Sequence, residues 1–143
     1  MLGMDHYCGS IGKIDSYIKG NYVHEGKKIP SMIDKLKSTE WKDENAISWI
    51  DLFFTKNIHI IGFGMDYAEQ DIWWVLNKRK RIIKEEKASV DNKIYFYDCG
   101  GSKSKIAMLE ALGVTVENAP GANSSQEWKS YYLKTIDKIK SKL

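Results

Sequence analysis

The sequence predicts an α/β fold in which a short parallel sheet of about three strands is flanked by helices and follows a helical N-terminal third. Three short runs rich in β-branched and aromatic residues, at 57–61, 94–97 and 114–116, alternate with segments of helical periodicity. Each connection is long enough for a helix, which favours parallel pairing with right-handed crossovers. We therefore expect a Rossmann-like arrangement within a single domain over residues 1–143.

Composition places the chain among ordinary globular proteins. It has 143 residues, of which 43% are hydrophobic and 29% charged, and the net charge of +3 is too small to argue for nucleic-acid binding, which we regard as unlikely. No apolar run approaches the ~18 residues of a membrane span, and the first residues do not form a secretory signal. The prediction is a cytoplasmic protein with no membrane contact, in which Cys8 and Cys99 are thiols.

The N-terminal third contains the signals of three helices, separated by polar segments. The first has Ser10 as its cap and Gly20 as its stop, the second opens at Pro30 after a polar loop over 21–29, and the third runs from Glu44 to about Lys56 with Asp43 as its cap.

The central stretch joins a strand to a glycine turn and a helix. Residues 58–61 are β-branched and apolar except for His59, which we take to indicate a strand buried on both faces, and Gly62-Phe63-Gly64 permits a sharp turn. Asp66 is placed to cap the next helix, with Glu69 completing a capping box. A strand followed by a glycine turn and a helix N-terminus presents backbone N–H groups that can bind an anion or a ribose hydroxyl. The alternative is a tight turn that binds no ligand.

A second glycine-rich turn follows the strand at 94–97. Asp98-Cys99-Gly100-Gly101-Ser102 offers a carboxylate and backbone amides to adenine or ribose, and Lys103 and Lys105 would favour an anion; the alternative is a loop without a ligand. A helix over Ser104–Leu112 comes next. Ser124 or Ser125 caps a last helix, whose apolar side we expect to be core or a dimer surface: Trp128, Tyr131, Tyr132, Leu133, Ile136 and Ile139.

Other chemistry-bearing residues point to structural roles. We expect His59 to be a hydrogen-bonded interior histidine and not a base, and Lys78-Arg79-Lys80-Arg81 to be a solvated helix end that complements the helix dipole. Phosphate or nucleic-acid contact is the minority interpretation of that run. Since His6, Cys8 and His24 do not have the spacing of zinc ligands, no metal site is predicted.

These motifs together resemble a known family. Ile60-Ile61-Gly62-Phe63-Gly64, Asp66, Asp71-Ile72, Lys93-Ile94-Tyr95-Phe96-Tyr97-Asp98 and Leu112-Gly113-Val114 resemble the C-terminal half of sirtuin-like NAD-binding domains, above all divergent bacterial ones. The opening residues 2–7, with Ile14, Tyr17, Ile18 and Gly20, are similar to the segment that follows the catalytic-histidine region in that family. The resemblance implies NAD binding at the carboxyl ends of the strands, with cofactor contacts from Gly62, Phe63, Gly64, Asp66, Asp98, Cys99, Gly100 and Gly101.

The resemblance also implies that catalytic parts are missing. The family uses a glycine loop after its first strand, an asparagine and a histidine, and this sequence has neither that strand and loop nor a histidine in a His-Gly setting. We therefore expect a partial NAD- or nucleotide-binding domain with little or no turnover, whether a truncated gene, an excised domain or a degenerate relative. The alternative is a non-enzymatic interaction module, in which a second copy or a partner chain completes the small sheet.

Overall fold

The structure is a computed structural model that describes residues 2–66, 68–85, 87–98, 100, 102–119 and 124–141, with side chains from residue 9 onward. It divides the chain into two compact units. The helical unit comprises Met1–Lys56 and Met65–Asn92, and the sheet unit comprises Asn57–Gly64 and Lys93–Leu143. A single domain over residues 1–143 stays a prediction.

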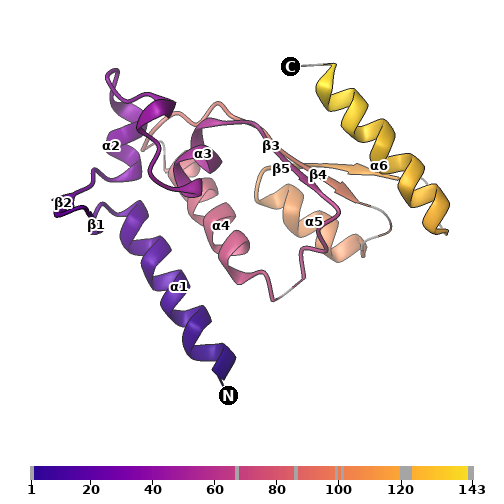
Figure 1. Ribbon diagram of the computed structural model, residues 1–143, viewed down its shortest axis with the longest axis horizontal. Helices are drawn as coiled ribbons and strands as arrows, with labels where there is room; N and C mark the ends of the chain where they lie inside the picture. The colour runs from indigo at the N-terminus through magenta and orange to yellow at the C-terminus, as the bar shows by residue number, and fades with distance from the viewer. Residues whose placement is uncertain are drawn as a thin grey trace. The chain divides into compact units, whose positions relative to one another are not determined.

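Short helices and one small hairpin make up the helical unit (Figure 1). Its elements are α1 (Leu2–Ile18), β1 (Val23–His24), β2 (Lys27–Lys28), α2 (Met32–Lys37), the 3₁₀ helix η1 (Asp43–Asn45), α3 (Trp49–Thr55) and α4 (Gln70–Lys84).

Helix α1 begins earlier than predicted and ends where predicted. It starts at Leu2, and Ser10 lies inside it, with its hydroxyl donating to Asp71 Oδ2 at 2.7 Å instead of capping the helix. At the other end Gly20 has φ +73°. The amide of Gly20 donates to the Tyr17 carbonyl and that of Asn21 to the Ser16 carbonyl, which is the Schellman arrangement of a helix stop.

The polar loop predicted over residues 21–29 contains a hairpin. Val23 pairs with Lys28 and His24 with Lys27 in an antiparallel ladder. The two residues between the strands, Glu25 and Gly26, have φ of +49° and +77°. Positive φ at both central positions suits a tight two-residue hairpin turn, whose twist matches that of the strands. Gly26 was the only sequence signal for this turn.

The next two helices are shorter than predicted. Ser31, and not Pro30, precedes α2, and its hydroxyl accepts the Asp34 amide at 3.2 Å. The helix predicted over 44–56 is broken into η1 and α3, because Ser48 and Asp51 form a capping box that starts a new helix at Trp49.

A buried ionic cluster joins α1, α2 and α3. The Lys35 ammonium donates to Asp51 Oδ1 at 2.7 Å and to the Tyr17 hydroxyl at 3.0 Å, and that hydroxyl donates to Asp51 Oδ2 at 2.5 Å. The side chains of Lys35 and Asp51 are almost wholly buried. Burial and the neighbouring Asp51 carboxylate raise the pKa of Tyr17 far above its ordinary value, so the phenol stays protonated.

Helix α4 does not begin at the predicted cap. Its N-cap is Glu69, which makes no side-chain capping bond, so the predicted capping box of Asp66 and Glu69 is wrong. Met65, buried and at φ +49°, turns the chain just before this segment. The Asp66 carbonyl accepts the indole N–H of Trp73 at 3.1 Å, so this residue contributes through its backbone.

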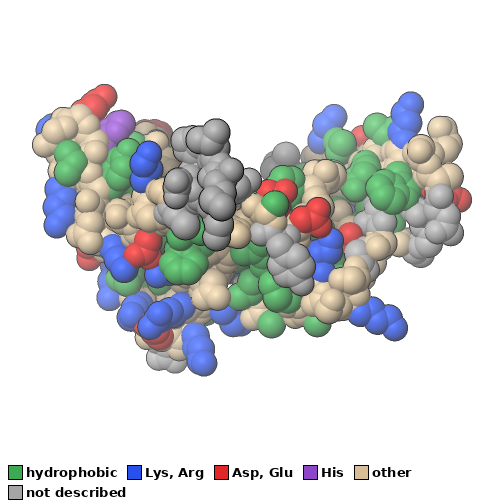
Figure 2. Space-filling model, turned by 90° about the horizontal axis from the view of Figure 1, so that it is seen from below, with side chains coloured by type: hydrophobic (Ala, Val, Ile, Leu, Met, Phe, Trp, Pro, Cys, Tyr) green, Lys and Arg blue, Asp and Glu red, His purple; other side chains and the backbone are tan. Residues whose placement is uncertain are grey.

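The basic run on α4 is less solvated than predicted. Arg79 is buried, and its guanidinium donates to the side chain and carbonyl of Asn92. Lys78 pairs with Asp15 at 2.6 Å, and Arg81 pairs with Glu85 at 2.7 Å. Three of the four cations are thus engaged within the helical unit. Figure 2 also shows hydrophobic side chains among charged ones of both signs on the face that it draws.

The sheet unit confirms the predicted class, a short parallel sheet flanked by helices. Strands β3 (Ile58–Ile61), β4 (Ile94–Asp98) and β5 (Val114–Asn118) are parallel and lie in the order β3-β4-β5. The prediction that β3 is buried on both faces is wrong: its residues are half-exposed, because it is a lateral strand of this sheet. The middle strand β4 provides the most buried residues, which include Ile94 and Phe96.

Helices α5 (Lys103–Ala111) and α6 (Ser125–Lys140) lie on opposite sides of the sheet (Figure 1). Ser124 is the cap of α6, and its capping box with Glu127 settles the choice between Ser124 and Ser125. The predicted buried side of α6 is largely wrong, since Thr135 is the buried residue of this helix and Trp128, Leu133 and Ile136 are exposed. No helix in the described part of the chain has the length and apolar content needed to cross a bilayer.

Candidate functional site

A pocket of about 310 Å³ lies where β3 and β4 end in the sheet unit. In parallel α/β sheets, ligands bind outside the carboxyl ends of the strands. The structure brings five of the predicted site residues to this pocket, together with four further side chains. The predicted ones are Gly62, Phe63, Gly64, Asp98 and Gly100, and the others are Tyr97, Lys105, Trp128 and Tyr132.

Three further predicted site residues remain. Cys99 and Gly101 lie outside the described residues. Asp66 belongs to the helical unit and does not line the pocket. The predicted contribution of Asp66 depended on a helix that began directly after Gly64, whereas α4 begins at Gln70.

The glycine turn after β3 is held by a lysine from α5. Gly62 has φ +66°, a left-handed conformation that favours glycine, and a Cβ there would meet nothing within 4 Å. Glycine is therefore needed at this position for its backbone angle and not for close packing. The carbonyl of Gly64 accepts the Lys105 ammonium at 2.6 Å, which brings a positive charge to the pocket wall.

Lys105 itself stands on the first turn of α5. The Ser102 hydroxyl caps this helix and accepts the Lys105 amide at 3.3 Å. The N-terminus of a helix carries a partial positive charge, which adds to that of the ammonium. This end of the pocket is therefore suited to a negatively charged group such as a phosphate.

Aromatic side chains from α6 also line the pocket. Trp128 and Tyr132 are one turn apart on α6, and Trp128 is 43% exposed. The helical spacing of these residues on an apolar stripe predicts that they are core or a dimer surface. Only the packing of α6 shows that they line a pocket, where flat rings can stack on a planar ligand.

A hydrogen-bonded cluster supports the pocket from the face of the sheet. His59 Nδ1 lies 2.9 Å from the Tyr97 hydroxyl, and the imidazole stacks on the Tyr95 ring at a centroid distance of 4.9 Å. The expectation of a hydrogen-bonded histidine at position 59 is confirmed. Burial first, and then the negative charge of Glu117, raise the pKa of Tyr97, so its phenol is a neutral hydrogen-bonding group and not a base.

Among the described residues, no group of three or more His, Cys, Asp or Glu side chains is arranged to hold a metal ion. Of the described residues that line the pocket, the charged ones are Asp98 and Lys105, one carboxylate and one ammonium. This combination can bind a polar ligand with a planar part, but it does not include a histidine for acid–base work.

Comparison of the chain with protein-family models, with curated proteins and with solved structures finds no match. The resemblance to sirtuin-like domains therefore stays a prediction that rests on the motifs described above.

Proposed function

We propose that the sheet unit binds a nucleotide, NAD or the ADP-ribose part of it, and holds it without turnover. The observation that carries this proposal is the pocket at the ends of β3 and β4, where a glycine turn, a carboxylate, an ammonium and four aromatic side chains line one cavity. These are the groups that a nucleotide needs: a close backbone approach, partners for ribose and phosphate, and stacking surfaces for a base.

Each group has a place in this proposal. Trp128 and Tyr132 stack on the adenine, Asp98 accepts from ribose hydroxyls, and Lys105 lies toward a phosphate. Asp98 is 8% exposed and sits at the end of the buried strand β4, so it is held by the sheet and not by a mobile loop. The volume is near the lower end of the range for ligand pockets, so we assign it to one nucleotide half of a dinucleotide.

Removal of the stacking surface tests this assignment. NAD and ADP-ribose are expected to raise the melting temperature of the chain saturably at millimolar concentrations. Trp128→Ala is expected to weaken their binding roughly tenfold, because stacking of a base on an aromatic ring is worth about 1–3 kcal/mol. Isothermal titration calorimetry measures the change in Kd.

The matched control is Trp49→Ala, which removes an exposed tryptophan from the helical unit and is expected to leave the Kd for ADP-ribose unchanged. Equal losses in both variants, or no binding by the unaltered chain at 10 mM nucleotide, would contradict the proposal. Hydrolysis of NAD by the purified chain at an enzyme-like rate would contradict the absence of turnover.

A second candidate function is self-association through α6. Leu133 is 53% exposed and Ile136 is 37% exposed, so this helix presents large apolar side chains to solvent. The packed side of α6 is a different one: Tyr131 donates to the Glu117 carbonyl at 2.8 Å, and Lys138 pairs with the Glu117 carboxylate at 2.7 Å.

Sedimentation equilibrium checks this candidate. The unaltered chain is expected to associate at micromolar concentration and Leu133→Lys to be monomeric, since a charge in the centre of an apolar interface stays unpaired. Lys134→Ala, at the next position of the same helix, serves as the control and is expected to associate normally. A monomeric unaltered chain would exclude this function.

A further inference from the structure

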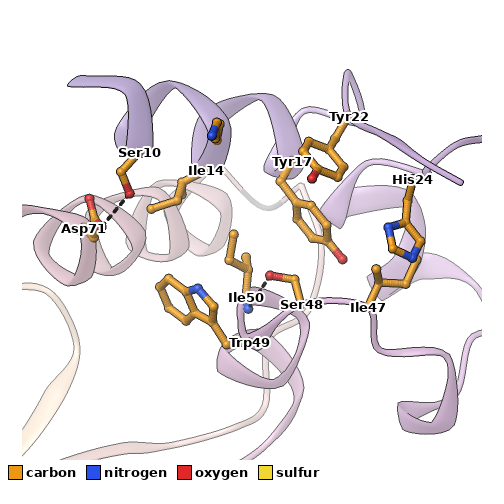
Figure 3. Close-up of a pocket in the computed structure, with 11 residues that line it drawn as sticks. Ser10, Ile14, Tyr17, Tyr22, His24, Ile47, Ser48, Trp49, Ile50 and Asp71 are labelled. Carbon is orange, nitrogen blue, oxygen red and sulfur yellow. Dashed lines mark hydrogen bonds between the residues drawn. The ribbon is translucent and has the colours of Figure 1, made fainter. Parts of the chain in front are cut away.

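A second pocket, wholly within the helical unit, contains an unsatisfied acceptor. It has a volume of about 350 Å³ and lies among α1, the chain before α3 and the first turn of α4 (Figure 3). Its walls are both polar and apolar, and none of its lining residues belongs to the nucleotide pocket proposed above. The residues that matter here are Ser10, Lys13, Ile14, Trp49, Ile50 and Asp71.

The unsatisfied acceptor is one oxygen of Asp71. Figure 3 shows the Ser10 hydroxyl bonded to this carboxyl group, and the bond to Oδ2 is 2.7 Å long. The other oxygen, Oδ1, is shielded from water and has no hydrogen-bond partner among the described residues. Buried polar atoms in proteins nearly always have a partner, so an orphaned carboxylate oxygen in a pocket wall calls for a donor. Asp71 lines the pocket and as a whole is only half-buried, so its carboxyl group borders the space that a bound molecule would fill.

Apolar groups surround this acceptor. Ile14 and Ile50 are buried, and Trp49 is 46% exposed although it lines a pocket. In Figure 3 the indole of Trp49 and the side chain of Ile14 lie near the Ser10–Asp71 pair. An indole ring attracts a cation through its π-electrons, and the attraction grows when water is excluded.

We propose that this pocket binds a small organic ammonium with an apolar or aromatic body. The ammonium donates to Asp71, where a charge-assisted hydrogen bond is stronger than a neutral one, and the body packs against Trp49, Ile14 and Ile50. An anion would meet the orphaned carboxylate oxygen and be repelled. Lys13 also lines the pocket, but its side chain is exposed, so its charge is screened by water.

The probe is phenethylammonium, and its matched control is 3-phenylpropionate, which has a similar body and the opposite charge. Each is titrated into the full chain at low ionic strength, and amide chemical shifts are followed by NMR. Phenethylammonium is expected to shift resonances near Ser10, Trp49 and Asp71 saturably and to bind at least tenfold more tightly than 3-phenylpropionate. Equal affinities, or shifts confined to the sheet unit, overturn the proposal.

Three variants separate the charge of Asp71 from its structural role. Asp71→Asn is expected to weaken phenethylammonium binding about tenfold, whereas Glu40→Gln, which removes an exposed acidic charge outside the pocket, is expected to change it less than twofold. Ser10→Ala keeps the carboxylate and frees its second oxygen, so binding is expected to be retained. Unchanged binding in Asp71→Asn, with native amide dispersion, overturns the proposal, as does a loss in Ser10→Ala that equals the loss in Asp71→Asn.

Discussion

Asp51→Ala is expected to lower the free energy of unfolding by about 3–5 kcal/mol, the cost of breaking a buried ion pair by removal of one partner. Of the partners of the buried Lys35 ammonium in the described part of the chain, the substitution leaves the Tyr17 hydroxyl. It also removes the acceptor of the Ile47 amide, at 3.0 Å, and half of the capping box of α3. Urea unfolding followed by circular dichroism measures the change.

Asp43→Ala is the matched control. Asp43 pairs with Lys56, but both side chains are substantially exposed, and such pairs contribute little to stability because water and salt screen them. The double variant Asp51→Ala with Lys35→Met is expected to regain part of the lost stability, because it removes the uncompensated charge. Equal effects of Asp51→Ala and Asp43→Ala would show that the cluster is not buried as described.

Gly20→Ala is expected to destabilise the chain by about 2–5 kcal/mol, as the sum of a left-handed backbone penalty and a steric clash. A Cβ at Gly20 would lie 2.6 Å from the Ser31 backbone nitrogen and 2.9 Å from its Cα. Ser31 is the cap of α2, so any movement of its backbone also weakens that helix.

Gly26 separates the two contributions to this effect. It has nearly the same φ, +77°, but a Cβ there would meet nothing within 4 Å. Gly26→Ala is therefore expected to cost only the backbone penalty, about 1–2 kcal/mol. Thermal and urea unfolding measure the loss of stability in each variant, and the two losses are expected to differ by the cost of the steric clash alone. Identical losses of stability would rule out the close approach of Gly20 and Ser31.

The sequence predicted the strands well because each is a short run with a strong preference. The runs at 58–61, 94–97 and 114–116, rich in β-branched and aromatic residues, all lie in β-strands, and the long connections between them favoured the parallel pairing that the sheet has. The sequence also indicated the glycine turn, and the structure places Gly62, Phe63, Gly64, Asp98 and Gly100 around one pocket.

Helix limits were predicted less well, because capping signals depend on local patterns that tertiary contacts can override. Asp66 and Glu69 have the spacing of a capping box, yet α4 starts later, after a turn at the buried residue Met65. The helix predicted from Glu44 breaks because the Asp51 carboxylate accepts the amides of Ile47 and Ser48. Since Asp51 also pairs with Lys35, this break depends on a residue of another helix.

Periodicity could not show which side of α6 packs against the sheet. The predicted apolar side was broad and included Tyr131, which does bond to the sheet together with Lys138, but it also included Leu133 and Ile136, which are exposed. Those contacts depend on Glu117, and no local sequence pattern shows where Glu117 lies relative to α6. The aromatic wall of the pocket was therefore missed, although its residues were named.

The two units are interleaved along the sequence, and this order has a consequence for synthesis of the chain on the ribosome. The helical unit contains residues that precede β3 and residues that follow it. The sheet unit contains β3 and all residues after Asn92. A ribosome therefore releases β3 long before β4, its neighbour in the ladder. While residues 65–92 emerge and the helices assemble, strand β3 has no hydrogen-bonding neighbour in its own sheet. Any pause in translation before β4 emerges prolongs the period in which the nascent chain is prone to aggregation.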